Sequence, residues 1–138
     1  MMRRRLWMRG GGVLGAALLG LATTAWAQTE GAGPLPEGDA DAGAELYAAQ
    51  CRACHGGSIA PSLRGVADRP IASEPEFGGY SDALKARAGD TWNVPNLDAF
   101  LRAPSAFAPG ARMAMSLADP QARADVIAYV RSLPPKRP

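Results

Sequence analysis

Two cysteines and the only histidine of the chain lie together near its middle, as Cys51, Cys54 and His55. The spacing Cys-x-x-Cys-His is the attachment signature of a c-type haem. Each thiol can add across one vinyl group of the porphyrin, which gives two thioether bonds on one helical turn. The same turn brings the imidazole under the iron as an axial ligand. The segment therefore predicts a covalently attached haem c with His55 as one iron ligand.

Three other uses of this segment fit the sequence less well. A structural zinc site needs about four protein ligands, whereas the chain has two cysteines and one histidine. A thioredoxin-like redox pair requires strands around the motif, and no convincing strand pattern lies nearby. A disulfide between Cys51 and Cys54 would close an unusually tight loop and would leave His55 unexplained. We therefore favour the haem.

The first 27 residues have the pattern of a secretory signal peptide. Arginines at positions 3, 4, 5 and 9 precede an apolar run over 13–25, and the small-residue motif Ala25-Trp26-Ala27 follows. This order predicts cleavage after Ala27 and export to a bacterial periplasm. The apolar run is shorter than the ~20 residues of a spanning helix, so a retained anchor is the less favoured alternative. We expect no stable membrane insertion after cleavage.

Cleavage changes the sign of the charge. Removing 27 of 138 residues leaves 111, enough for one small domain. The predicted signal carries four of the 15 basic residues and none of the 13 acidic ones, so the mature chain has 11 basic and 13 acidic residues and a formal charge of −2. No basic patch with interleaved aromatics is present, and nucleic-acid binding therefore has no support.

The mature chain is predicted to consist of a flexible leader, residues 28–38, and one all-α domain, residues 39–138. The leader is rich in Gly and Pro and has no apolar period. Capping residues and apolar spacing predict helices that begin at Asp39, Ser81, Asn93 and Asp119. The first of them leads into Cys51. Repeats and alternating strand patterns are absent from the sequence.

The second axial position of the iron has two candidate ligands. After signal removal only Met113 and Met115 remain as methionines. Met113 follows a Pro109-Gly110 turn that can direct its side chain at the iron, whereas Met115 can serve as an apolar lid. A thioether is a soft, neutral ligand that favours ferrous iron, and His/Met ligation raises the reduction potential. We favour Met113; ligation by Met115 and an open site are the alternatives.

These segments in this order resemble class I cytochrome c, in particular the bacterial relatives of mitochondrial cytochrome c. The resemblance extends from Asp39 to Leu133. It rests on Gly43 and Tyr47 before Cys51-Arg52-Ala53-Cys54-His55, on Pro61-Ser62-Leu63, Tyr80-Ser81-Asp82-Ala83, Trp92, Leu97, Pro104, Pro109 to Met113, and Arg123 to Val130. It implies a small monohaem fold of about four helices, with loops wrapped around the haem.

The resemblance also implies roles for residues around the motif. The carbonyl oxygen of Pro61 would accept a hydrogen bond from the ring of His55 and fix the imidazole. Tyr80, Trp92 and Arg69 would hydrogen-bond or neutralise a buried haem propionate. Plain core packing is the alternative for the two aromatic residues.

Some positions depart from the family pattern. Gly43 follows the pattern: a glycine inside a helix costs about 1 kcal/mol relative to alanine, which indicates the close approach of another helix. The family implies that this is the last helix, near Tyr129. In contrast, Phe100 occupies a position where the family often has a tyrosine bonded to the methionine sulfur. Leu84 and Ala111 replace polar residues near the haem. The methionine ligand is therefore expected to be held more by packing than by hydrogen bonds.

With both axial positions filled, substrate cannot reach the iron, and no acid, base or nucleophile set converges elsewhere. The sequence thus predicts a soluble, monomeric, periplasmic one-electron carrier, which is not an enzyme and acts between a donor and an acceptor redox protein. One alternative is a dedicated cytochrome subunit of a periplasmic dehydrogenase or oxidase. The other is a haem-based gas sensor or small peroxidase with a displaceable Met113.

Overall fold

The computed structural model describes residues 33–137. The predicted signal peptide and residues 28–32 of the predicted leader lie outside this range. The first helical rod is continuous and consists of α1 (Ala40–Leu46), the π-helical turn η1 (Tyr47–Cys51) and α2 (Arg52–His55). The other helices are α3 (Asp82–Lys85), α4 (Val94–Arg102), α5 (Pro104–Phe107) and α6 (Pro120–Ser132).

The four predicted helix starts are confirmed. The side chain of Asp39 accepts hydrogen bonds from the backbone N–H groups of Asp41 and Ala42, at 2.8 and 3.2 Å. Ser81, Asn93 and Asp119 cap α3, α4 and α6 in the same way. One short helix, α5, was not predicted. It begins at Pro104, after the single residue Ala103 that follows α4, and proline is tolerated in the first turn of a helix.

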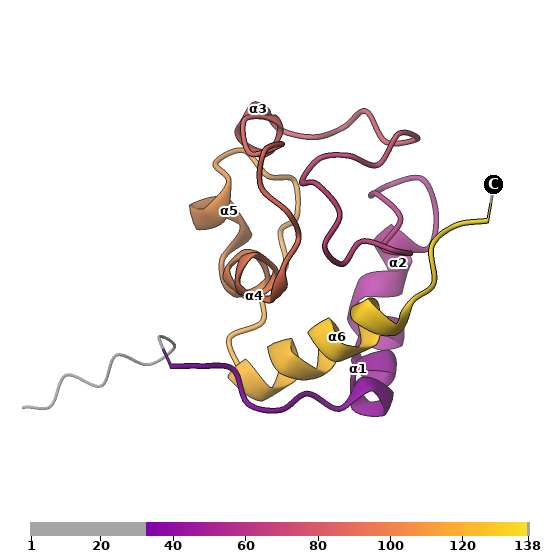
Figure 1. Cartoon of the computed structure of the whole chain (residues 1–138), viewed down its shortest axis with the longest axis vertical. Helices are drawn as coiled ribbons and strands as arrows, with labels where there is room; N and C mark the ends of the chain where they lie inside the picture. Colours follow the sequence, from indigo (N-terminus) through magenta and orange to yellow (C-terminus); the bar gives the residue numbers. More distant parts are fainter. Residues whose placement is uncertain (1–32, 138) are drawn as a thin grey trace, which may run out of the picture.

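Within residues 33–137 the only β pairing is an isolated antiparallel bridge between Pro70 and Thr91, so the predicted all-α class is confirmed. The rod α1–η1–α2 crosses α6, and α4 packs on α6 from the other side (Figure 1). No helix in the described part of the chain has the length and apolar character to cross a membrane.

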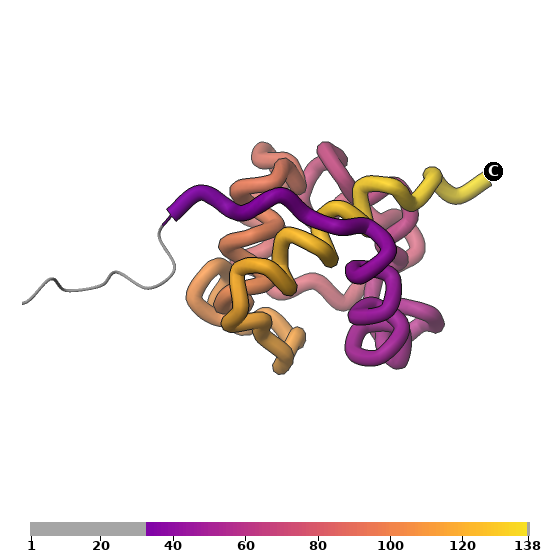
Figure 2. Tube along the Cα trace, turned by 90° about the horizontal axis from the view of Figure 1, so that it is seen from below, coloured from indigo at the N-terminus to yellow at the C-terminus, as the bar shows by residue number. Residues whose placement is uncertain are grey.

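The end of the predicted leader runs along α6. Figure 2 shows the indigo segment before α1 crossing the yellow helix. The Gln121 side-chain amide donates a hydrogen bond to the carbonyl oxygen of Glu37 at 2.8 Å. A Cβ atom on Gly38 would lie 2.2 Å from the carbonyl oxygen of Ala124, so the segment lies directly on the helix backbone.

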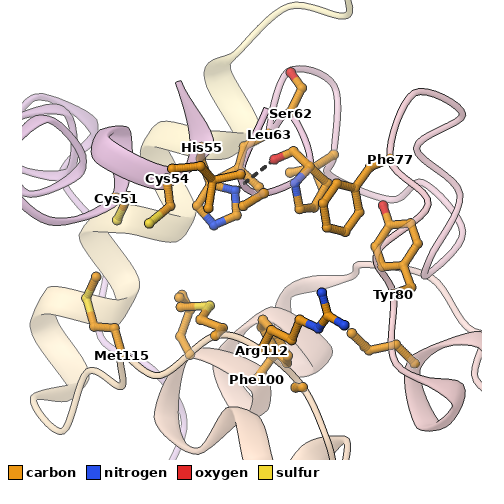
Figure 3. Close-up of a pocket in the computed structure, with 18 of the residues that line it drawn as sticks. Cys51, Cys54, His55, Ser62, Leu63, Phe77, Tyr80, Phe100, Arg112 and Met115 are labelled. Atoms are coloured by element: carbon orange, nitrogen blue, oxygen red, sulfur yellow. Dashed lines mark hydrogen bonds between the residues drawn. The ribbon is translucent and has the colours of Figure 1, made fainter. Parts of the chain in front are cut away.

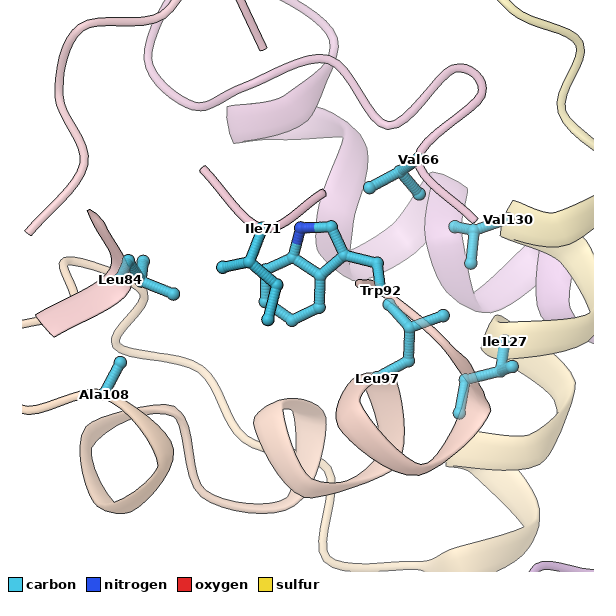
Figure 4. Close-up of a cluster of buried hydrophobic side chains, with 8 residues drawn as sticks. All are labelled: Val66, Ile71, Leu84, Trp92, Leu97, Ala108, Ile127 and Val130. Carbon is cyan, nitrogen blue, oxygen red and sulfur yellow. The ribbon is translucent and has the colours of Figure 1, made fainter. Parts of the chain in front are cut away.

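The hydrophobic core is built from loops as much as from helices. Its buried members are Val66, Ile71, Leu84, Trp92, Leu97, Ala108, Ile127 and Val130 (Figure 4). Backbone hydrogen bonds hold the loop around residue 70 against the segment before α4: Trp92 donates to Arg69 at 2.9 Å, and Ile71 donates to Asp90 at 3.0 Å. These bonds place the two segments side by side at the edge of the core.

The crossing of α1 over α6 depends on Gly43. A Cβ atom at this position would lie 2.0 Å from the carbonyl oxygen of Asp125 and 2.9 Å from the Cβ atom of Tyr129. The predicted close approach of another helix is therefore confirmed, and it explains a glycine that costs about 1 kcal/mol of helix propensity relative to alanine.

We expect Gly43→Ala to lower the free energy of unfolding by about 2 kcal/mol. Overpacking against a backbone that cannot move costs up to about 3 kcal/mol, which exceeds the gain of about 1 kcal/mol in helix propensity. Urea unfolding of the haem-loaded protein measures the difference. Gly57→Ala is the matched control, because a Cβ atom there meets nothing within 4 Å. A Gly43→Ala protein as stable as that control would contradict the expectation.

Candidate functional site

A large cavity of about 700 Å³ lies between the first helical rod and the segment that precedes α6. Its size falls in the range of small-molecule and cofactor sites, and its lining is mostly apolar. All eight residues predicted to contact the cofactor line this cavity. They are Cys51, Cys54, His55, Pro61, Arg69, Tyr80, Trp92 and Met113. The structure thus brings together residues that span 63 positions of the sequence, from Cys51 to Met113; their roles stay predictions.

The two thiols lie on one turn at the end of the first rod. In η1 the N–H of Arg52 bonds to the carbonyl oxygen of Tyr47, five residues earlier, and this wider turn ends at Cys51. The Cys51 thiol is buried, Cys54 is exposed, and both sulfur atoms point to the cavity side (Figure 3). Burial raises the pKa of the Cys51 thiol. The two sulfurs are not joined, and no cluster of three His, Cys, Asp or Glu side chains occurs among residues 33–137.

The His55 ring projects into the cavity from the same wall (Figure 3). Its Nδ1 atom lies 2.7 Å from the carbonyl oxygen of Pro61, which is the hydrogen bond implied by the resemblance. A carbonyl oxygen can only accept, so Nδ1 carries the hydrogen. The neutral imidazole then keeps its lone pair on Nε2, and the Pro61 bond fixes the ring plane. This is the form in which imidazole ligates iron.

Both remaining methionines, Met113 and Met115, line the cavity. Figure 3 shows Met115 and Phe100 across the cavity from His55. The segment that carries both methionines is not helical and follows the turn at Gly110, where φ is +78° and favours glycine.

Two contacts attach the end of this segment to the helices. The backbone N–H of Leu117 donates to the carbonyl oxygen of Leu101 in α4 at 2.8 Å. The guanidinium of Arg123 in α6 donates to the carbonyl oxygens of Leu117 and Ala118 at 2.9 and 2.6 Å. The position of the methionine segment therefore depends on α4 and α6.

The polar end of the cavity carries donors for an anionic group. The Nε atom of Arg69 is buried and has no hydrogen-bond partner, and such a donor is costly unless an acceptor meets it. Burial raises the pKa of the Tyr80 hydroxyl, which therefore stays neutral. Its oxygen accepts from the backbone N–H of Glu74 at 3.2 Å, so its hydrogen is available for another acceptor. These groups fit a carboxylate such as a haem propionate.

Trp92 has both of its expected environments. It lines the cavity, and its ring also packs in the core, 5.1 Å from the ring of Phe100 and 5.8 Å from that of Phe107. Sequence reasoning missed Phe77, whose ring meets Tyr80 edge-on at 4.9 Å. The one trace of this contact in the sequence is Gly79, because a Cβ atom at that position would lie 2.7 Å from the Phe77 ring.

A helical domain around a mostly apolar cavity, with two thiols and one imidazole on a single turn, defines a c-type haem protein. The family model "Cytochrome c" matches residues 40–134. The cytochrome c of Tetrahymena pyriformis is 42% identical over 72% of this chain and 93% of its own length. Cytochrome c2 of Rhodomicrobium vannielii is 38% identical over 67% of this chain and 78% of its own.

A solved structure has the same fold. Cytochrome cH from Methylobacterium extorquens matches with a TM-score of 0.58 and 34% identity, and it covers 69% of this chain and 99% of its own. The chain belongs to the cytochrome c family. It is a class I monohaem electron carrier, and its cofactor is haem c, attached covalently through cysteines.

Proposed function

We propose that this protein is a soluble, monomeric, periplasmic one-electron carrier whose haem iron is ligated by Nε2 of His55 and the sulfur of Met113. The hydrogen bond between His55 and Pro61 supports this proposal most directly, because it fixes the imidazole tautomer for ligation at Nε2. Met113 lies in the lining of the same cavity, and its thioether would be the second ligand that the chain offers to the iron.

The residues of the chain have separate tasks in this carrier. When bound, the haem supplies an iron that takes up and releases one electron. Cys51 and Cys54 hold the group on the turn, and His55 donates its Nε2 lone pair. Met113 favours the ferrous state, because a thioether is soft and neutral. Phe100 has no hydroxyl to offer the sulfur, so packing holds the methionine.

The rim of the cavity near Cys54 is the expected place of electron entry. Cys54 is exposed, and Ile59, which also lines the cavity, has 72% of its surface exposed. It is the only large hydrophobic side chain exposed among residues 33–137. We expect a donor and an acceptor protein to dock here with an apolar contact that depends little on salt.

The periplasmic location is supported by the N-terminal pattern. The arginines, the apolar run and the small-residue motif in residues 1–27 are those of an export signal.

A visible spectrum with a redox titration of the exported protein tests the proposal. We expect haem that resists extraction after denaturation, the far-red charge-transfer band of ferric His/Met haem, and one reversible one-electron transition. Rapid binding of carbon monoxide to the ferrous protein without loss of a native ligand would instead indicate an open site, as in a gas sensor or peroxidase. Co-purification with a large partner would favour a subunit of a dehydrogenase or oxidase.

A further inference from the structure

A buried carboxylate lies behind the polar end of the cavity. The Glu74 side chain is 3% exposed, and its Oε2 atom lies 3.0 Å from Nη1 of Arg69. Its Oε1 atom lies 3.4 Å from Nζ of Lys136, in the tail after α6. Lys136 also hydrogen-bonds Glu76, whose side chain is 73% exposed. Arg69 and Lys136 therefore face the carboxylate of Glu74. The Tyr80 hydroxyl contacts the same residue at its backbone N–H group.

The hydrogen bonding of this cluster is incomplete. Oε2 of Glu74 and Nε of Arg69 are both buried and have no hydrogen-bond partner. Arg69 lines the cavity, whereas Glu74 lies behind it. The guanidinium thus faces a buried carboxylate on one side and the cavity on the other, and part of its charge already balances Glu74.

We propose that Glu74 sets the reduction potential of the haem by adding a buried negative charge at its propionate end, which Arg69 and Lys136 compensate only in part. This inference rests on the proposed function, in which Arg69 and Tyr80 meet a propionate. One electron from a reduced partner protein converts ferric to ferrous iron and lowers the charge there by one unit. A nearby carboxylate opposes that change and lowers the potential.

Burial gives Glu74 this role and not Glu76. The two carboxylates are two residues apart and share Lys136, but water and salt screen the exposed one. The hydrogen bond from Lys136 lowers the pKa of the Glu76 carboxyl. The ammonium group of Lys136 therefore contacts both carboxylates and balances only part of the charge of Glu74.

The midpoint potentials of haem-loaded Glu74→Gln and Glu76→Gln proteins test the inference. At the potential where the wild-type protein is half reduced, we expect Glu74→Gln to shift the ferrous-to-ferric ratio about tenfold toward ferrous. This is the attraction of unit charges roughly 12 Å apart at an effective dielectric of about 20, and it equals about 59 mV for a one-electron couple. The matched control Glu76→Gln should change the ratio by less than about twofold.

A second variant keeps the inference testable if Glu74→Gln does not fold. Lys136→Gln removes a positive charge from the same cluster and should shift the ratio toward ferric, by less than about tenfold because the Lys136 side chain is more exposed than that of Glu74. A purely structural role for Glu74 would change unfolding but not the potential.

The outcomes separate this inference from the proposed function. Equal potentials for wild-type and Glu74→Gln proteins, or equal shifts for Glu74→Gln and Glu76→Gln, would overturn the inference. A wild-type protein without a reversible one-electron transition would overturn the proposed function instead.

Discussion

Met113→Ala is expected to open the haem site. With the thioether removed, His55 is the only ligand left of the proposed pair, and the far-red charge-transfer band of the ferric protein should be lost. The ferrous protein should bind carbon monoxide within mixing time. The midpoint potential should fall by on the order of 0.2 V, since axial ligands tune haem over about 0.8 V and the soft sulfur favours ferrous iron.

Met115→Ala is the matched control for this variant, because Met115 lies in the same segment and lines the same cavity. We expect it to keep the band and to bind carbon monoxide slowly. Loss of the band in Met115→Ala with its retention in Met113→Ala would assign the ligand to Met115. A band that survives both substitutions would refute ligation by methionine.

Local chemistry made the helix starts predictable. Asp39, Ser81, Asn93 and Asp119 each cap a helix through a bond to backbone only two or three residues away, so a short window of sequence contains the whole interaction. Gly43 was predictable for a different reason. A glycine inside a helical pattern is unfavourable unless something lies against it, and α6 does.

The charged contacts could not be predicted in this way. Glu74 pairs with Lys136, 62 residues away, and Asp98 pairs with Arg123, 25 residues away. No spacing rule links such positions, because the contact exists only after the loops have packed. Most of the residues around the cavity were likewise implied by family resemblance; periodicity did not locate them. Phe77 is not among the residues that carry the resemblance, and α5, which begins at Pro104, is too short to have an apolar pattern.

Asp98→Ala is expected to be the most destabilising substitution among the charged residues. Asp98 in α4 pairs with Nε of Arg123 in α6; the Arg123 side chain is 1% exposed and that of Asp98 17%. Removing the carboxylate leaves the guanidinium buried without a counter-charge, which costs about 3–5 kcal/mol. Urea unfolding of the ferric haem-loaded protein measures this loss against a total stability of about 5–15 kcal/mol for a small domain.

The exposed pair between Asp82 and Lys85 provides the control. Its atoms are 3.4 Å apart and both side chains are largely in water, so Asp82→Ala should cost no more than about 1 kcal/mol. Equal losses for Asp82→Ala and Asp98→Ala would show that burial of the second pair has no energetic consequence.

The double variant Asp98→Leu with Arg123→Met separates charge from hydrogen bonding. Replacing a buried pair with apolar residues of similar volume is often neutral or stabilising, so the double variant should be more stable than Asp98→Ala. It should not reach wild-type stability, because the carbonyl oxygens of Leu117 and Ala118 lose their donor, at a cost of about 1–3 kcal/mol each.

The same two carbonyl groups lie at the end of the segment that carries Met113. As the pH is raised, the far-red band should therefore disappear at a lower pH in the double variant than in the wild-type protein. If the pH at which half of the band is lost is the same in both proteins, Arg123 does not position the ligand.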